Sequence, residues 1–294
     1  MTPIDSVQRL TRRLRRQLTT RRRRAIPVAR FDATARGWTD VDASGAADRD
    51  ELTLSTFNVW FDSSHAEQRY LAIADLLSRR TPDIMVFQEV TAVALTVFLA
   101  QPWIREHYLR AAIIEKDVGN YGMLVLSRLP VNNVTYTRLP SRQDRGFLEA
   151  ELTINGARRV VCCIHLDSGK VSSPLRGKQL RTIFCALETT ENAVLLGDFN
   201  MRDAENDRIV DPYTDVWPAL RPDDAGYTED TSINLMRYDM KDKHRQVRFD
   251  RVLVKGSRWA PARIELLGTE PVSSALPRVF PSDHFGVECR LKLH

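Results

Sequence analysis

The stretch AVLLGDFNMRD, residues 193–203, combines the pattern of a buried strand with polar side chains at the strand's end. Residues 194–196, Val-Leu-Leu, are all apolar, which is typical of a strand covered on both faces. Gly197 follows, at a place where a side chain would block the close approach of another segment. Because residues i and i+2 of a strand point the same way, we expect Asp198 and Asn200 to converge on one object.

The same arrangement recurs along the chain, where apolar runs end in acids, amides or histidines. Such groups are costly to desolvate without a partner, so we expect one charged object to gather them. Carboxylate-rich sites without cysteine suit a hard cation such as magnesium or manganese, which also binds phosphate oxygens. The pattern therefore predicts a metal-assisted phosphoester hydrolase. The residues at these run ends are Asn58, Glu89, His165, Asp167, Ser168, Asp198, Asn200, Asp250, Asp283 and His284.

Strand and helix patterns follow one another without a break in composition from Leu52 onward. Residues 52–60 and 82–90 predict strands, and residues 65–80 predict a helix between them. The later strand patterns follow one another closely, which indicates a largely antiparallel arrangement. We therefore predict a basic tail and polar linker over residues 1–50 and one α/β catalytic domain over residues 51–294.

The net charge of +5 comes from the N-terminal segment. Residues 1–24 carry nine arginines and one acid, and the remainder carries 34 basic and 37 acidic residues, a formal charge of −3. Leu10 and Leu14 lie on one helical stripe, so this tail predicts a basic amphipathic helix on an anionic surface. A solvated extension and a tether to nucleic acid or to an anionic membrane both fit this pattern.

Hydropathy argues against a membrane-spanning protein. No apolar run approaches the roughly 20 residues that a transmembrane helix needs, and the N-terminus lacks the apolar middle region of a secretory signal. The four cysteines show no CxxC spacing, which argues against a zinc site. We therefore expect a cytoplasmic monomer, while the arginine-rich start leaves targeting to an organelle open.

Six motifs, read in order, resemble the endonuclease/exonuclease/phosphatase superfamily, whose members include deoxyribonuclease I and the apurinic endonucleases. They are FNVW, FQEV, HLDS, GDFN, FDRV and SDHFG, spread over residues 57–286. Each motif is weak alone, and the ordered set makes a chance match improbable. The resemblance implies a four-layer α/β sandwich, in which two mixed, mainly antiparallel β-sheets pack face to face with helices outside.

The resemblance also implies a metal site and a bound nucleophile. Glu89 is then the principal ligand of Mg²⁺, or of Mn²⁺, and Asp283 assists near the ion. Asn58 positions the phosphate or water beside it. Asp198 orients and deprotonates the attacking water, and Asn200 holds the water or Asp198 in place.

Two histidines are implied to stabilise the charge that develops on the phosphate oxygens. These are His165 and His284, with Asp250 orienting His284 and Ser168 adding a hydrogen-bond donor. Taken singly, His165 also fits a core histidine whose hydrogen bonds are satisfied. The ordered set of motifs is the reason for preferring the catalytic interpretation.

The motifs YTDVWPAL and FPSDHFG most resemble the branch of the superfamily that removes a tyrosine from a 5′ phosphate of DNA. That branch implies that Tyr121 packs against the tyrosyl leaving group and that Phe249 belongs to an apolar wall for single-stranded DNA. Glu229 stands where the branch has a DNA-facing tryptophan, so we expect its carboxylate to repel DNA phosphates and weaken the grip on DNA.

These observations predict a magnesium-dependent phosphodiesterase that acts on nucleic-acid ends, with a 5′-phosphotyrosyl DNA adduct as its substrate, as in DNA repair. One alternative is a related hydrolase of another phosphoester: a general nuclease, a sphingomyelinase or an inositol phosphatase. The other alternative is an inactive module that binds nucleic acid through the same scaffold and the basic tail. Retention of every acid, base and donor in the motifs favours an enzyme over this module.

Overall fold

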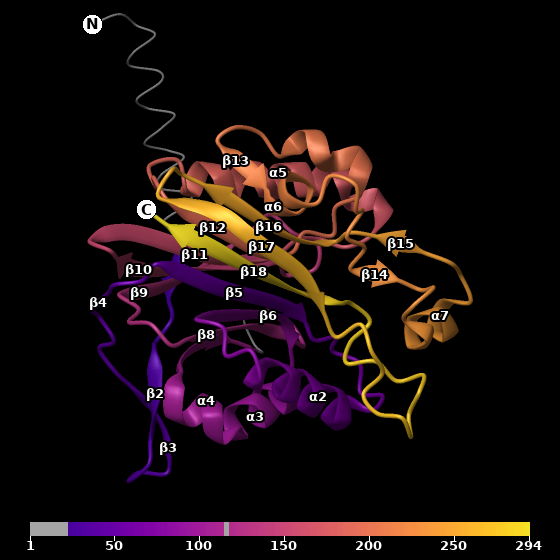
Figure 1. Cartoon of the computed structure of the whole chain (residues 1–294), viewed down its shortest axis with the longest axis horizontal. Helices are drawn as coiled ribbons and strands as arrows, with labels where there is room; N and C mark the ends of the chain where they lie inside the picture. The colour runs from indigo at the N-terminus through magenta and orange to yellow at the C-terminus, as the bar shows by residue number, and fades with distance from the viewer. Residues whose placement is uncertain (1–22, 115–117) are drawn as a thin grey trace, which may run out of the picture.

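Two eight-stranded β-sheets form the centre of the molecule (Figure 1). The computed structural model describes residues 23–114 and 118–294. The first sheet has the order β1 (Arg23–Ala25), β9 (Asn133–Arg138), β10 (Gly146–Ile154), β11 (Ala157–His165), β12 (Ala193–Asp198), β16 (Asp250–Lys255) and β13 (Tyr213–Asp215), and β4 (Ala46–Ala47) pairs with β10. The second has the order β17 (Trp259–Leu267), β18 (Gly286–Leu293), β5 (Glu51–Asn58), β6 (Ile84–Val90), β8 (Gly122–Ser127), β7 (Leu109–Ile113), β2 (Ala29–Asp32) and β3 (Gly37–Asp40).

Both sheets are mixed and mainly antiparallel. The parallel pairs are β5 with β6, β11 with β12 and β4 with β10. In the first two pairs a helix returns the chain to the same end of the sheet, as parallel neighbours require. Within each sheet the carboxyl ends of the two paired strands therefore lie at the same edge, and the polar side chains follow these strand ends.

Helices cover the outer face of each sheet, which gives four layers (Figure 1). Helices α2 (Ala66–Ser78), α3 (Ala92–Ala100) and α4 (Pro102–His107) contribute to a core with the second sheet, and α5 (Ser173–Ala186) contributes to a core with the first. A third core fills the space between the sheets. On β12, Val194 and Leu196 belong to the core between the sheets, while Leu195 packs in the core shared with α5. Burial on both faces explains the uninterrupted apolar run and confirms the predicted sandwich.

The shorter elements fall in the sequence between β11 and the final strand, β18. They are η1 (Lys170–Ser172), η2 (Asp203–Arg208), α6 (Val216–Leu220), the paired strands β14 (Glu229–Asp230) and β15 (Gln246–Val247), and α7 (Leu235–Lys241). Figure 1 shows β14, β15 and α7 together at the end of the molecule opposite to the C-terminus. No helix in the described part of the chain has the length and apolar character needed to cross a bilayer.

Residues 25–50 differ from our expectation of a polar linker. Strand β1 pairs with β9, β4 pairs with β10, and β2 and β3 extend the second sheet beyond β7. Ile26 and Ala29 are buried in this segment. Pairing at sheet edges satisfies backbone groups that an edge strand would otherwise expose, and sequence periodicity does not reveal it. The division of the chain at residue 50 stays a prediction, and the arginine-rich segment over residues 1–22 lies outside the described residues.

Candidate active site

Most of the predicted residues meet at the edge where strands of both sheets end. In the first sheet His165 pairs with Asp198 across β11 and β12, and Asp198 pairs with Asp250 across β12 and β16. Asn58 ends β5 in the facing sheet, and its Nδ2 donates to Asp198 Oδ2 at 3.1 Å. This hydrogen bond joins the two sheets at the candidate site.

Asp198 is held by amide donors on both of its oxygens. The backbone N–H of Asn200 donates to Oδ1 at 2.8 Å, and the Asn200 side chain donates to Oδ2 at 2.7 Å. Asn200 lies beyond the strand with φ 51°, so a left-handed turn rather than strand alternation brings the pair together. Gly197 is required for close packing, because a Cβ there would lie 2.1 Å from the carbonyl oxygen of Ile164.

The surroundings of Asp198 suit a group that accepts a proton. Burial raises the pKa of Asp198; His284 opposes this shift, and the charges of Asp250 and Glu89 add to it. A carboxylate with a raised pKa holds a proton more strongly than an exposed one, which favours removal of a proton from water.

His284 and Asp250 form a buried pair behind this carboxylate. His284 Nδ1 lies 2.8 Å from Asp250 Oδ2, and because an ionised carboxylate only accepts, Nδ1 carries the hydrogen. Burial alone would lower the pKa of His284, but the carboxylates of Asp250, Asp283 and Asp198 outweigh it and raise the pKa well above its ordinary value. The three carboxylates therefore favour the imidazolium form of His284.

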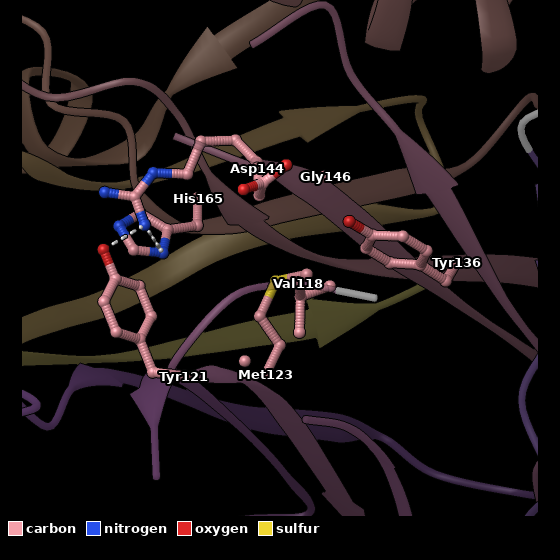
Figure 2. A pocket seen from close by; sticks show the side chains of 9 residues that line it. Val118, Tyr121, Met123, Tyr136, Asp144, Gly146 and His165 are labelled. Carbon is pink, nitrogen blue, oxygen red and sulfur yellow. Dashed lines mark hydrogen bonds between the residues drawn. The ribbon is translucent and has the colours of Figure 1, made fainter. Parts of the chain in front are cut away.

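The second histidine is neutral, and Arg145 determines its tautomer. Arg145 Nη1 donates to Tyr121 Oη at 3.0 Å and lies 3.1 Å from His165 Nδ1 (Figure 2). A guanidinium has no acceptor, so His165 Nδ1 accepts and Nε2 carries the hydrogen. Burial lowers the pKa of His165 well below its ordinary value, and the charges of Arg145 and His284 lower it further.

The Nε2–H of His165 is directed at the carboxylates of the site. Nε2 is buried without a hydrogen-bond partner in the described part of the chain, and it lies 3.6 Å from Asp198 Oδ2 and 3.8 Å from Glu89 Oε1. With a neutral ring these are not ion pairs, and the N–H is free to donate to a substrate oxygen. Sequence reasoning missed Arg145, since no motif surrounds it and only its place before β10 hints at this edge.

Glu89 leaves the regular strand pattern at a β-bulge. It has φ 60°, and the pairing of β6 with β8 shifts register between Gln88 and Val90. Glu89 Oε2 accepts from the backbone N–H of Phe61 at 3.2 Å. Burial raises the pKa of Glu89, and the charge of Asp283 raises it further. Two carboxylates that repel each other are a suitable place for a divalent cation, because Mg²⁺ is usually held by one or two carboxylates together with water and phosphate oxygens.

Another group of possible ligands consists of Asp198, Asp250 and His284, whose ligand atoms lie within 4.8 Å of one another. The Nδ1 atom of His284 is already bound to Asp250, and Asp198 accepts from two asparagines. These contacts orient a proton acceptor and a cationic donor. The chemistry of the donors fits a divalent cation such as Mg²⁺ at Glu89 and Asp283, because these carboxylates are near enough to repel each other, whereas Nδ1 of His284 in the other group is occupied by Asp250.

Two predicted substrate-binding residues are not freely presented to a ligand. Ser168 exchanges hydrogen bonds with Gln143, which donates from Nε2 to Ser168 Oγ at 3.0 Å. Phe249 is only 4% exposed and packs against His284, with ring centroids 5.8 Å apart. Phe249 thus lies beside a catalytic candidate and offers little open surface to a base.

Glu229 overturns the expectation of a carboxylate that faces DNA. It is 1% exposed, and it accepts from Arg237 Nε at 2.9 Å and from Arg245 Nη1 at 3.0 Å. Arg237 Nη1 also lies 3.4 Å from Asp283 Oδ2. Because two guanidinium groups neutralise the carboxylate, the predicted repulsion of phosphates is wrong.

Arg69 fixes two loops that flank the metal-ligand candidates. Its guanidinium is fully buried on α2 and stacks over Trp60, with Cζ 4.5 Å from the ring centroid. Within the described residues the guanidinium donates to backbone carbonyls, so it fixes the course of the chain. The accepting residues are Val59 (3.0 Å), Trp60 (3.3 Å), Asp62 (2.5 Å), Ser64 (2.9 Å) and Pro281 (3.5 Å).

The chain is similar to proteins of known family. The profile of the Endonuclease/Exonuclease/phosphatase family matches residues 55–284. Tyrosyl-DNA phosphodiesterase 2 of Xenopus laevis is 30% identical over 259 residues, which cover 82% of this chain and 67% of that protein. The Gallus gallus protein of the same name is 27% identical, with 81% and 66% covered, so the chain spans about two thirds of the length of these relatives.

Solved structures show the same fold. A crystal structure of D. rerio TDP2 complexed with single-strand DNA product has a TM-score of 0.74 at 23% identity, and the match covers 83% of this chain and all (100%) of that chain. Truncated Caenorhabditis elegans TDP2 has a TM-score of 0.70 at 23% identity, with 82% and 97% covered. At this level of identity, the likeness concerns the fold.

Proposed function

The chain belongs to the endonuclease/exonuclease/phosphatase family, and from this premise we propose that it is a magnesium-dependent phosphodiesterase that releases tyrosine from a 5′-phosphotyrosyl end of DNA. The names of the curated relatives support this substrate. The observation that carries the proposal is the convergence on Asp198 Oδ2 of two amide donors and the free Nε2–H of His165. This is an arrangement for one water and one phosphate oxygen.

In the proposed reaction Asp198 accepts a proton from the attacking water while Asn58 and Asn200 keep the carboxylate in place. The water oxygen forms a bond to phosphorus, and the bond from phosphorus to the tyrosyl oxygen breaks. The tyrosyl oxygen leaves with the bonding electron pair. A phenol has a pKa of about 10, so this leaving group needs little help from an acid compared with an alkoxide.

Charge on the phosphate oxygens is stabilised by both histidines in this proposal. His165 donates from Nε2, and the His284 imidazolium, held by Asp250, adds positive charge. When bound by Glu89 and Asp283, a magnesium ion would supply further positive charge to the non-bridging oxygens.

The test compares turnover of four substrates with Mg²⁺: 5′-phosphotyrosyl DNA, abasic DNA, sphingomyelin and an inositol phosphate. We expect turnover of phosphotyrosyl DNA, its loss by about 10²–10⁴-fold in Asp198→Asn with substrate binding retained, and a weakened magnesium response in Glu89→Gln. Efficient turnover of a lipid or an inositol phosphate instead would replace the substrate. No turnover at all, with unchanged DNA binding in Asp198→Asn, would favour a binding module.

A further inference from the structure

Phe61 is an exposed aromatic residue at the candidate active site that the motifs do not include. Its side chain is 48% exposed, among the most exposed of the large apolar residues in the described part of the chain. Its ring stacks on Tyr121 with centroids 4.7 Å apart and an interplanar angle of 19°. A single exposed apolar side chain is ordinary on a protein surface, so its place decides what it does.

The backbone of Phe61 is fixed relative to the metal-ligand candidate. Its N–H donates to Glu89 Oε2, and the loop that carries it is held by Arg69 through the carbonyls of Trp60 and Asp62. The backbone at Phe61 is therefore fixed beside the Glu89 carboxylate, and stacking on Tyr121 holds the Phe61 ring. A rigid ring gains more from stacking than a mobile one, because less conformational entropy is lost when a ligand binds.

Tyr121 is already engaged by other groups. Its hydroxyl accepts from Arg145 Nη1, the Arg145 guanidinium lies 5.3 Å from the ring centroid, and the His165 ring lies 6.1 Å away. The Phe61 ring occupies a stacking position as well. Of the two rings, Phe61 has the more open surface, because Tyr121 is only partly exposed.

We infer that Phe61 presents the stacking surface that receives a planar aromatic leaving group, and that Tyr121 supports Phe61 from behind. This inference rests on the proposed function and adds its leaving-group site. A phosphate bound beside Glu89 brings an aryl group attached to it within reach of the neighbouring ring. An alkyl group on the same phosphate has no π face and gains little from Phe61.

The experiment compares two esters of thymidine 5′-monophosphate, one with p-nitrophenol and one with an alkyl alcohol, at saturating Mg²⁺. We expect Phe61→Ala to raise KM for the aryl ester roughly 3- to 10-fold without a matching change for the alkyl ester. Phe61→Trp should retain the low KM. Leu71→Ala is the matched control, because Leu71 is 44% exposed on α2 and lies outside the site.

Equal effects of Phe61→Ala on both esters, or no effect on either, would overturn the inference. A raised half-saturating magnesium concentration with an unchanged ratio of the two KM values would assign the ring to loop support instead. If neither ester turns over, binding affinity gives the same contrast. Two proteins, Asp198→Asn and Asp198→Asn with Phe61→Ala, are compared for binding to DNA with a 5′-phosphotyrosyl end and to DNA with a plain 5′ phosphate. Failure of the proposed function appears separately, as absence of turnover of phosphotyrosyl DNA by the unmodified protein.

Discussion

Glu229 and two arginines form a buried cluster beside the candidate active site, and Glu229→Gln is expected to unbalance its charge. Glutamine keeps the shape and one acceptor oxygen of the side chain but removes the negative charge. Arg237, whose side chain is 12% exposed, then keeps one carboxylate partner in the described part of the chain, Asp283, at 3.4 Å. Arg245 is 35% exposed and can turn its guanidinium toward water.

The expected loss of stability follows from this difference in exposure. Removal of one partner of a buried ion pair costs about 3–5 kcal/mol when the remaining charge has no other partner. Here Arg245 reaches solvent and Arg237 retains a carboxylate, so we expect the free energy of unfolding to fall by about 2–3 kcal/mol. For a domain of this size, that lowers the Tm by about 4–12 °C.

Denaturant unfolding at several pH values tests both the size and the sign of the effect. Burial raises the pKa of Glu229, but Arg237, His284 and Arg245 outweigh it and hold the pKa below its ordinary value. The stabilisation is therefore complete above about pH 4.3, the pKa of an unperturbed glutamate, and is lost as the pH falls through the lower pKa of the folded state. The difference between the unmodified protein and Glu229→Gln should shrink in that range.

The control is Asp75→Asn, which removes a carboxylate from an exposed pair with Arg79. Exposed pairs contribute about 0–1 kcal/mol, so this variant should unfold almost like the unmodified protein. A loss below about 0.5 kcal/mol in Glu229→Gln would refute the reasoning, since a buried cluster cannot cost so little to unbalance. A loss that stays constant at acidic pH would also refute it.

Three further predictions concern catalysis, the metal site and the N-terminal segment. Asp250→Asn should lower kcat more than about tenfold and shift the alkaline limb of the kcat profile to lower pH, because His284 loses the carboxylate that raises its pKa. Arg69→Lys should raise the half-saturating magnesium concentration at least about threefold, since three ammonium donors cannot replace the guanidinium fork. The control is Arg159→Lys, because Arg159 is equally buried but lies at the far end of β11. This control should lower stability without changing the half-saturating magnesium concentration. Deletion of residues 1–22 should flatten the salt dependence of DNA binding, measured by fluorescence anisotropy, without changing kcat on a small phosphodiester, because arginine contacts to phosphate release counterions.

The sequence by itself determined the fold class and the ends of the strands that carry the candidate site. Continuous apolar runs such as residues 194–196 indicate burial on both faces, and a carboxylate or amide directly after such a run marks its exit from the core. These are local properties, so they can be read without knowing which strands are neighbours. The roles of Asp198, Glu89 and the two histidines stay predictions, although the structure brings these residues together.

Only the tertiary structure decided how the site is held and which groups are charged. Arg145 is 20 residues from His165, and Arg69 is 212 residues from Pro281, so neither contact leaves a local pattern. Glu229 shows the same limit. A glutamate in the sequence predicts an exposed charge, whereas in the folded chain two arginines lie beside Glu229 and neutralise it. Charge states, tautomers and ion pairs depend on burial and on partners distant in sequence, and packing of the folded chain sets both.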